Sequence, residues 1–217
     1  MSKESEPGLM RKQGNLVGKV RYTGLFTETT GARSNLAPGI PKGTRVPRHS
    51  SKKLPEKVAE IVKSALRPVK RFFQDESRIG RISQPIRCWS PAGVRPVVPC
   101  QIVREYLYVY GAVCPEDGSF TSLILPDMRT ECLNLFLAEL SNRYPDNHLL
   151  VVWDGGGSHR SGELIVPEHM TLLPLPPYSP ELNPQENVWG KIKEEGFYNK
   201  VFNCLDAVEE QFVKVLR

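Results

Sequence analysis

The chain has 217 residues, of which 40% are hydrophobic and 24% are charged. That length holds one ordinary domain with a real core, and the composition is that of a globular chain rather than a fibrous or wholly disordered one. The first fifty residues contain nine Lys and Arg against three Asp and Glu, whereas the other residues contain 20 against 21. The net charge of +5 therefore belongs to an N-terminal tail, which could contact nucleic-acid phosphates or simply be solvated.

Five cysteines are scattered along the chain without a C-x-x-C pair, a pattern typical of reduced thiols in a cytosolic protein. No apolar run reaches the length of a membrane span, and the N-terminus lacks the apolar core of a signal peptide. We therefore expect a cytoplasmic protein with no membrane partner.

Residues 1–52 are rich in glycine and show no sustained apolar period, so we predict a basic, disordered tail or linker. They contain no helix-turn-helix pattern. The pattern changes at Lys53, where a helix is predicted to begin and to end at Pro68. Its apolar residues recur at helical spacing: Val58, Ile61, Val62 and Leu66.

Three strands are predicted next. The first covers residues 71–77 (RFFQDES), and its apolar part stops at the acidic pair Asp75-Glu76. The second covers residues 104–113, which are rich in aromatic and β-branched side chains. An Asp-Gly turn within residues 115–119 then favours a hairpin, with residues 120–125 as the antiparallel partner.

The second half alternates helices with short apolar strands. A helix capped by Asp127 or Thr130 is expected to run to Tyr144, with Leu133, Phe136, Leu137 and Leu140 on one face. The later elements are strands at 149–153 and 170–175, a helix starting at Asn183, and a helix over 205–216. This order predicts an α/β fold with a mixed sheet flanked by helices.

Asp154 directly follows the apolar strand 149–153 and precedes three glycines. In open α/β sheets, ligands gather beyond the carboxyl ends of strands, and glycines let a ligand approach the backbone closely. A Walker phosphate loop is excluded, because no Lys-Ser/Thr pair follows at the required spacing. The alternative is that Asp154 is only a turn residue after a core strand, which is the more common case for a lone aspartate.

Glu186 also has two interpretations. Asn183 as the N-cap, Pro184 at the first helical position and Glu186 three residues after the cap would form a capping box. A carboxylate in the first turn also faces the positive end of the helix dipole, which keeps it ionised and able to bind a cation. The two roles are compatible, and both stay open at this point.

A Mg²⁺ site takes few protein carboxylates and fills its other positions with water and phosphate oxygens. Two such ions can activate an attacking water and stabilise the leaving oxygen of a phosphodiester. This chemistry needs a third carboxylate on a neighbouring strand, and Asp75 is the first candidate. Glu76 points to the opposite face and is the second. Asp117 and Asp127 are better explained by a turn and a helix cap.

Three segments together resemble the acidic blocks of DDE transposases, in particular bacterial insertion-sequence transposases of the mariner superfamily. The segments are residues 73–78 (FQDESR), 152–155 (VWDG) and 177–187 (PYSPELNPQEN). The third block is highly specific, and 31 residues separate Asp154 from Glu186. The resemblance implies a ribonuclease-H-like catalytic domain over residues 53–217. It also implies Asp75, Asp154 and Glu186 as the catalytic and metal-binding triad, with Mg²⁺ or Mn²⁺ as cofactor.

The function that the resemblance implies is DNA transposition, through metal-dependent cleavage and transfer of DNA strands. The expected partners are double-stranded DNA, on the bacterial nucleoid, and a second copy of the chain or a full-length transposase. Members of the family carry an N-terminal helix-turn-helix region, and residues 1–50 contain none, so we expect a chain without its DNA-recognition domain. The alternative is a non-catalytic, truncated transposase that binds DNA or full-length transposase and regulates transposition.

Other polar residues near the acidic blocks are weaker candidates. His159 matches a histidine of the second block and could position a phosphate or a water, or could be an exposed loop residue. Trp189 is expected to pack in the core. Four basic residues could hold DNA phosphates, although a solvated face is the commoner explanation: Arg78, Arg160, Lys191 and Lys193.

Overall fold

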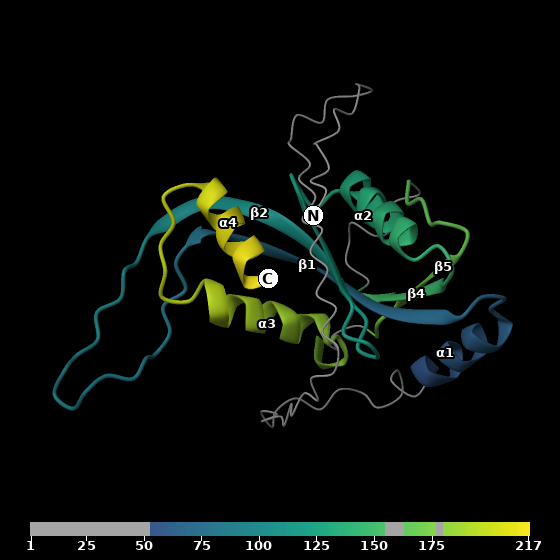
Figure 1. Cartoon of the computed structure of the whole chain (residues 1–217), viewed down its shortest axis with the longest axis horizontal. Helices are drawn as coiled ribbons and strands as arrows, with labels where there is room; N and C mark the ends of the chain where they lie inside the picture. Colours follow the sequence, from purple (N-terminus) through teal and green to yellow (C-terminus); the bar gives the residue numbers. More distant parts are fainter. Residues whose placement is uncertain (1–52, 155–162, 177–179) are drawn as a thin grey trace, which may run out of the picture.

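The computed structural model describes residues 53–154, 163–176 and 180–217. The prediction for residues 1–52 lies outside these ranges and stays a prediction. Within them, helices and strands follow one another in the predicted order (Figure 1). None of the described helices is both long enough and apolar enough to cross a membrane. The elements are α1 (Lys53–Ser64), β1 (Val69–Ile82), β2 (Ile102–Val113), β3 (Phe120–Leu125), α2 (Thr130–Arg143), β4 (His148–Trp153), β5 (Met170–Pro174), the 3-10 helix η2 (Pro180–Leu182), α3 (Gln185–Gly196) and α4 (Leu205–Val215).

The strands form one mixed sheet in the order β3-β2-β1-β4-β5. β1, β2 and β3 are antiparallel neighbours, whereas β4 and β5 run parallel to β1. The predicted hairpin turn is confirmed: Gly118 has φ 73°, and the Asp117 carboxylate accepts a hydrogen bond from the Ser119 N–H. The predicted mixed sheet with flanking helices is therefore correct.

Helices cover both faces of this sheet. On one face, α2 buries Phe136 against Phe72 and Val151. On the other face, α1 packs on Leu150 and Val152. Because successive side chains of β4 point to opposite faces and both faces are covered, the whole strand is apolar, as expected of a buried parallel strand.

The rest of that second face is covered by α3 and α4, which lie over β1 and β2 (Figure 1). Trp189 and Ile192 of α3 and Phe212 of α4 share a buried cluster with Val109 and Ile124 of the sheet. The second face therefore carries α1 over β4, and α3 with α4 over β1 and β2. The candidate active site lies between these two groups of helices.

The end of α1 differs from the prediction. The helix stops at Ser64, and Val62 and Leu66 are 47% and 102% exposed. Of the four apolar residues predicted to line one face, only Val58 and Ile61 pack against the sheet. The helix ends at Ser64 because Pro68 has no N–H to donate to the Ser64 carbonyl and its ring would clash with that carbonyl.

The predicted end of β1 was wrong. The strand continues to Ile82, so Asp75 lies in its middle rather than at its end. It continues because β2 pairs with it from Phe73 to Ile82 and satisfies its backbone hydrogen bonds. The parallel partner β4 stops at Trp153, opposite Gln74. The end of β4, and not of β1, therefore creates the edge at which Asp75 lies.

Candidate active site

Asp75 and Asp154 occupy equivalent positions on neighbouring parallel strands. The last paired residues of β1 and β4 are Gln74 and Trp153, so each aspartate is the next residue of its chain. Adjacent strands lie about 4.8 Å apart, and side chains in parallel register point to the same face. Here that face is the one covered by α1, α3 and α4, because Phe73 and Val152 both contribute to the α1 cluster. Asp75 is 9% exposed and Asp154 is exposed.

The third predicted carboxylate, Glu186, is the second residue of α3 and is exposed. The helix approaches Asp75 closely, since the Trp189 indole Nε1–H donates a hydrogen bond of 3.0 Å to Asp75 Oδ2. Residues three apart lie on neighbouring positions of a helix surface. Anchoring Trp189 on Asp75 therefore brings Glu186 to the same region of the sheet.

The electrostatics of Asp75 reflect both neighbours. Burial raises the pKa of Asp75 to about 7, and the charges of Glu186 and, more weakly, Asp154 add to the rise. Hydrogen bonds from the Glu76 backbone N–H and the Trp189 indole lower it, because they stabilise the charged form. Coulombic repulsion falls with distance. Because repulsion acts between Asp75 and Glu186 and also between Asp75 and Asp154, the three carboxylates share one electrostatic environment.

In the described part of the chain, no three His, Cys, Asp or Glu side chains lie close enough together to hold a metal ion. The three predicted residues thus share a region without forming a closed ligand cluster. Their chemistry nevertheless fits a divalent cation. Carboxylate oxygens are the ligands that Mg²⁺ and Mn²⁺ prefer, and a cation would offset the repulsion that raises the pKa of Asp75.

The start of α3 settles part of the capping question. The Asn183 side chain accepts a hydrogen bond of 3.1 Å from the Gln185 N–H, as a capping residue does. The helix itself begins one residue later than a capping box requires, with Pro184 in the N-cap position. Within the described residues, the Glu186 carboxylate accepts no hydrogen bond from the Asn183 backbone N–H. The capping box is therefore half formed, and Glu186 is left facing solvent.

Gly111 and Gln185 were not identified from the sequence. Gly111 is paired with Asp75 across β1 and β2. A Cβ atom on Gly111 would lie 2.6 Å from Trp189 Cη2 and 2.8 Å from Gln185 Nε2, so only glycine lets α3 lie this close. Gln185 is fully buried, and within the described ranges its amide Oε1 and Nε2 have no hydrogen-bond partner. Buried polar atoms are rarely left this way. The orphaned amide beside Gly111, the cross-strand neighbour of Asp75, is a second sign that a polar ligand belongs here.

Comparison with known proteins decides the family. The sequence signature described as "DDE superfamily endonuclease" matches residues 70–209, well over half of the chain. The chain belongs to the DDE superfamily of endonucleases. A protein of Sinorhizobium fredii (strain NBRC 101917 / NGR234), the uncharacterized protein y4pE/y4sA, is 39% identical over 104 residues. That alignment covers 48% of this chain and 77% of the relative.

Solved structures confirm the fold of this DDE endonuclease. The Mos1 transposase paired-end complex with the left transposon end matches with a TM-score of 0.53 at 12% identity, over 86% of this chain and 63% of that chain. A pre-cleavage Mos1 transpososome matches with a TM-score of 0.54 at 12% identity, over 86% and 64%. The predicted ribonuclease-H-like fold is confirmed. This chain spans less than two thirds of the length of these two Mos1 chains.

Glu76 lies on the other face of the DDE endonuclease sheet, as predicted. It is paired with Tyr110, which belongs to the α2 cluster, and its carboxylate accepts a hydrogen bond of 3.0 Å from Gln74 Nε2. Burial raises the pKa of Glu76 to about 7. Glu76 is thus a half-buried carboxylate held within its own strand, on the face away from Trp189.

The remaining candidates divide between structural roles and undescribed segments. Asp117 holds the β2–β3 turn, as expected. The predicted cap of α2 was wrong: Arg129 occupies the N-cap position without a side-chain cap bond, and Asp127 instead accepts a hydrogen bond of 3.0 Å from the Arg129 N–H just before the helix. His159 and Arg160 lie outside the described residues. Lys191 forms exposed ion pairs with Glu194 and Glu195.

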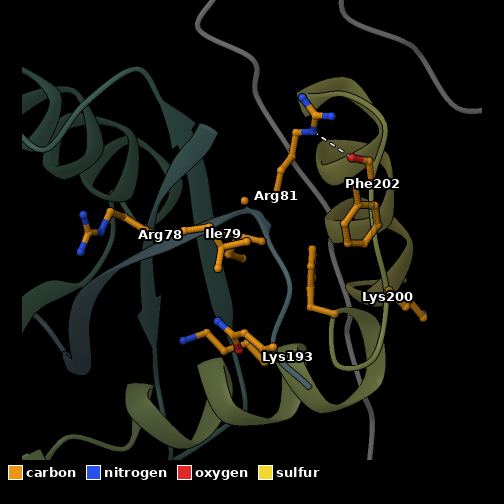
Figure 2. Close-up of a pocket in the computed structure, with 10 residues that line it drawn as sticks. Arg78, Ile79, Arg81, Lys193, Lys200 and Phe202 are labelled. Atoms are coloured by element: carbon orange, nitrogen blue, oxygen red, sulfur yellow. Dashed lines mark hydrogen bonds between the residues drawn. The ribbon is translucent and has the colours of Figure 1, made fainter. Parts of the chain in front are cut away.

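A small basic pocket lies at the far end of α3, between that helix, β1 and the segment before α4 (Figure 2). Arg81 forms one wall, where its Nε donates to the Phe202 carbonyl oxygen (2.8 Å) and its Nη1 to the Glu105 carboxylate (2.7 Å). Arg78 extends away from Phe202 in Figure 2 and stacks on Tyr106, with 5.6 Å to the ring centroid. The basic side chains at the pocket do not point toward one position; they are Arg78, Arg81, Lys193 and Lys200.

Proposed function

We propose that this chain is the catalytic domain of a transposase that cleaves and transfers DNA strands with Mg²⁺ or Mn²⁺. The observation that carries the proposal is the placement of Asp75, Asp154 and Glu186, from β1, the end of β4 and the start of α3, on one face of the sheet. Membership of the DDE endonucleases and the fold shared with Mos1 transposase complexes support it. Mos1 has been solved with Mg and with Mn, which supports the choice of cation.

Asp75, Asp154 and Glu186 would hold the cation. When bound, Mg²⁺ or Mn²⁺ supplies activation of the attacking water or hydroxyl and stabilisation of the leaving phosphodiester oxygen. The three residues would hold the cation from different sides. Asp75 is buried and fixed by Trp189, so it forms the inner edge of the site. Asp154 and Glu186 are exposed and face the side from which a phosphodiester would arrive.

DNA is the proposed substrate, and α3 offers a route for its backbone. Lys193 lies seven residues after Glu186, so it falls on the same stripe of the helix, about 10 Å along the axis. Within the described ranges it forms no ion pair, in contrast to Lys191. A free ammonium group at that distance suits a phosphate on the strand that leads away from the cleaved bond. The predicted partner, a second copy or a full-length transposase, stays a prediction.

The test is cleavage of duplex DNA that carries the sequences flanking the gene, with Mg²⁺ or Mn²⁺, together with calorimetric Mn²⁺ binding in the absence of DNA. We expect Asp75→Asn, Asp154→Asn and Glu186→Gln each to lose both cleavage and tight Mn²⁺ binding. Asp117→Asn is the matched control, because this aspartate holds the β2–β3 turn and pairs with Lys70, and it is not one of the three proposed ligands. Wild-type cleavage by the three variants would overturn the proposal. DNA binding without cleavage by the wild-type chain would favour the regulatory alternative instead.

A further inference from the structure

We propose that Trp189 is a positioning residue of the active site: its indole N–H holds Asp75 in the orientation that a cation requires, and Gly111 provides the space for it. The inference rests on the proposed function, in which Asp75 is a ligand. It goes beyond it by assigning a role to two residues that carry no charge. The role predicted for Trp189 from the sequence was packing alone.

The hydrogen bond itself is the first observation. Trp189 Nε1 and Asp75 Oδ2 are 3.0 Å apart, and the two residues are 2% and 9% exposed. In the described part of the chain, this is the only hydrogen bond from a side chain to the Asp75 carboxylate. The Glu76 backbone N–H adds a second hydrogen bond to the same carboxylate. An ionised carboxylate has about four acceptor positions, so acceptor capacity remains for a cation. Metal-binding carboxylates are commonly oriented in this way by an outer donor.

The chemistry of the donor is the second step. An indole N–H donates and cannot accept, so it binds the charged form of the carboxylate and fixes its direction. It carries no net charge, so it leaves the negative charge of Asp75 to attract a cation. A Lys or Arg in the same place would form an ion pair and cancel that charge. Tryptophan therefore suits the outer side of a cation ligand.

The third step is the rigidity of the ring. Trp189 is packed in the cluster under α3 and α4, and its ring meets Phe120 edge-on, with centroids 6.2 Å apart and an interplanar angle of 81°. Gly111, the cross-strand neighbour of Asp75, lies directly beneath the ring, where a Cβ would come within 2.6 Å of Cη2. The direction of the N–H is thus fixed by packing, and the position of Asp75 is fixed by the N–H.

Calorimetry separates positioning from packing. Trp189→Phe keeps a ring and removes the donor, and we expect Mn²⁺ binding roughly 10–100-fold weaker, the usual cost of losing an outer-shell partner. Phe120→Leu is the matched control, because it disturbs the same ring packing and leaves the N–H in place. It should bind Mn²⁺ close to the wild-type affinity. Equal losses in both variants would show that packing alone matters and would overturn the inference.

A second measurement needs no variant of Trp189. The chain has three tryptophans, so its ¹H–¹⁵N spectrum has three indole resonances, assignable by triple-resonance experiments. Addition of Mg²⁺ should move the Trp189 resonance in the wild-type chain and leave it unmoved in Asp75→Asn. An unmoved resonance in a wild-type chain that binds Mg²⁺ would overturn the inference.

These outcomes differ from those that bear on the proposed function. If Asp75→Asn and Asp154→Asn bind Mn²⁺ like the wild type, the proposed function fails and the inference fails with it. If those variants lose Mn²⁺ while Trp189→Phe binds it normally, the function stands and only the inference fails.

Discussion

The two faces of β1 carry adjacent carboxylates with contrasting surroundings. Asp75 and Glu76 are consecutive, and burial raises the pKa of both to about 7. On the Asp75 face, Glu186 and Asp154 approach from two other elements, and Trp189 donates a hydrogen bond. On the Glu76 face, Gln74, two residues earlier in the same strand, donates a hydrogen bond to the Glu76 carboxylate.

The difference shows that burial and a raised pKa do not by themselves mark an active site. Both carboxylates have these properties, and the Asp154 charge raises the pKa of both. What distinguishes Asp75 is α3, which brings it the charge of Glu186 and the hydrogen bond from Trp189. Convergence of the three carboxylates requires the end of β4 and the start of α3 to meet β1 at one point. The predictions below test whether function follows convergence or burial.

The largest effect is expected on DNA cleavage. Asp75→Asn should lower the cleavage rate by more than the roughly 10–100-fold that loss of an outer-shell partner costs, because it removes a proposed ligand. Glu76→Gln should leave cleavage close to wild type, since the new amide oxygen can still accept the hydrogen bond from Gln74. Single-turnover cleavage with Mn²⁺ measures both. Equal losses would mean that the two faces act together and would contradict the comparison.

The local patterns of the chain were enough to predict most elements. The Asp-Gly turn and the apolar run after it placed β3 over Phe120–Leu125, as observed. The length of β1 could not be predicted in the same way, because it depends on pairing with β2, whose sequence is distant. The three motif blocks identified the carboxylates. That Asp75 and Asp154 lie side by side could be seen only from the register of β1 and β4.

The roles of two residues of the site could not be predicted from the sequence. The bond between Trp189 and Asp75 joins positions 114 residues apart, and a tryptophan among apolar neighbours is typical of core packing. Gly111 lies inside an aromatic and β-branched strand, where a glycine indicates close approach without saying of what. Only the packing of α3 onto β2 reveals the approaching group.

Stability in metal-free buffer should depend on pH with a definite sign. Below about pH 4, Asp75 is protonated in both the folded and the unfolded chain and contributes nothing. Between pH 4 and 7 the folded chain alone keeps the proton, so its stability falls as the pH rises, and the full cost is present above pH 7. Asp75→Asn should therefore stabilise the chain at pH 8 by roughly 2–4 kcal/mol, and much less at pH 4.

Urea denaturation with EDTA at the two pH values measures this effect. Glu76→Gln should show the same sign, because burial also raises the pKa of Glu76. Adding Mn²⁺ distinguishes the two faces of β1, because it should stabilise the wild type and Glu76→Gln but not Asp75→Asn. A less stable Asp75→Asn at pH 8 would contradict the electrostatic description of the site.

Two glycine substitutions test how closely α3 must lie on the Asp75 face. Gly111→Ala should cost about 1–3 kcal/mol and weaken Mn²⁺ binding, because its Cβ would press on Trp189 and Gln185. Gly190→Ala on the same helix meets no described atom within 4 Å and should instead stabilise by about 0.5–1 kcal/mol. Thermal denaturation and Mn²⁺ titration of the pair check this. An unaffected Mn²⁺ affinity in Gly111→Ala would show that the site tolerates displacement of the helix.

The smallest effect concerns which face the DNA backbone follows. Lys193 lies on α3, along the stripe of Glu186, whereas Arg78 follows the alternation of Glu76 to the opposite face and stacks on Tyr106. A lysine that contacts one phosphate contributes about 0.9 to the slope of log affinity against log salt concentration. Lys193→Ala should reduce the slope by about that amount, and Arg78→Ala should leave it nearly unchanged. Fluorescence anisotropy with duplex DNA at several salt concentrations measures both slopes. If Arg78→Ala has the larger effect, the DNA crosses the sheet edge, and the convergence of carboxylates does not define the DNA-binding face.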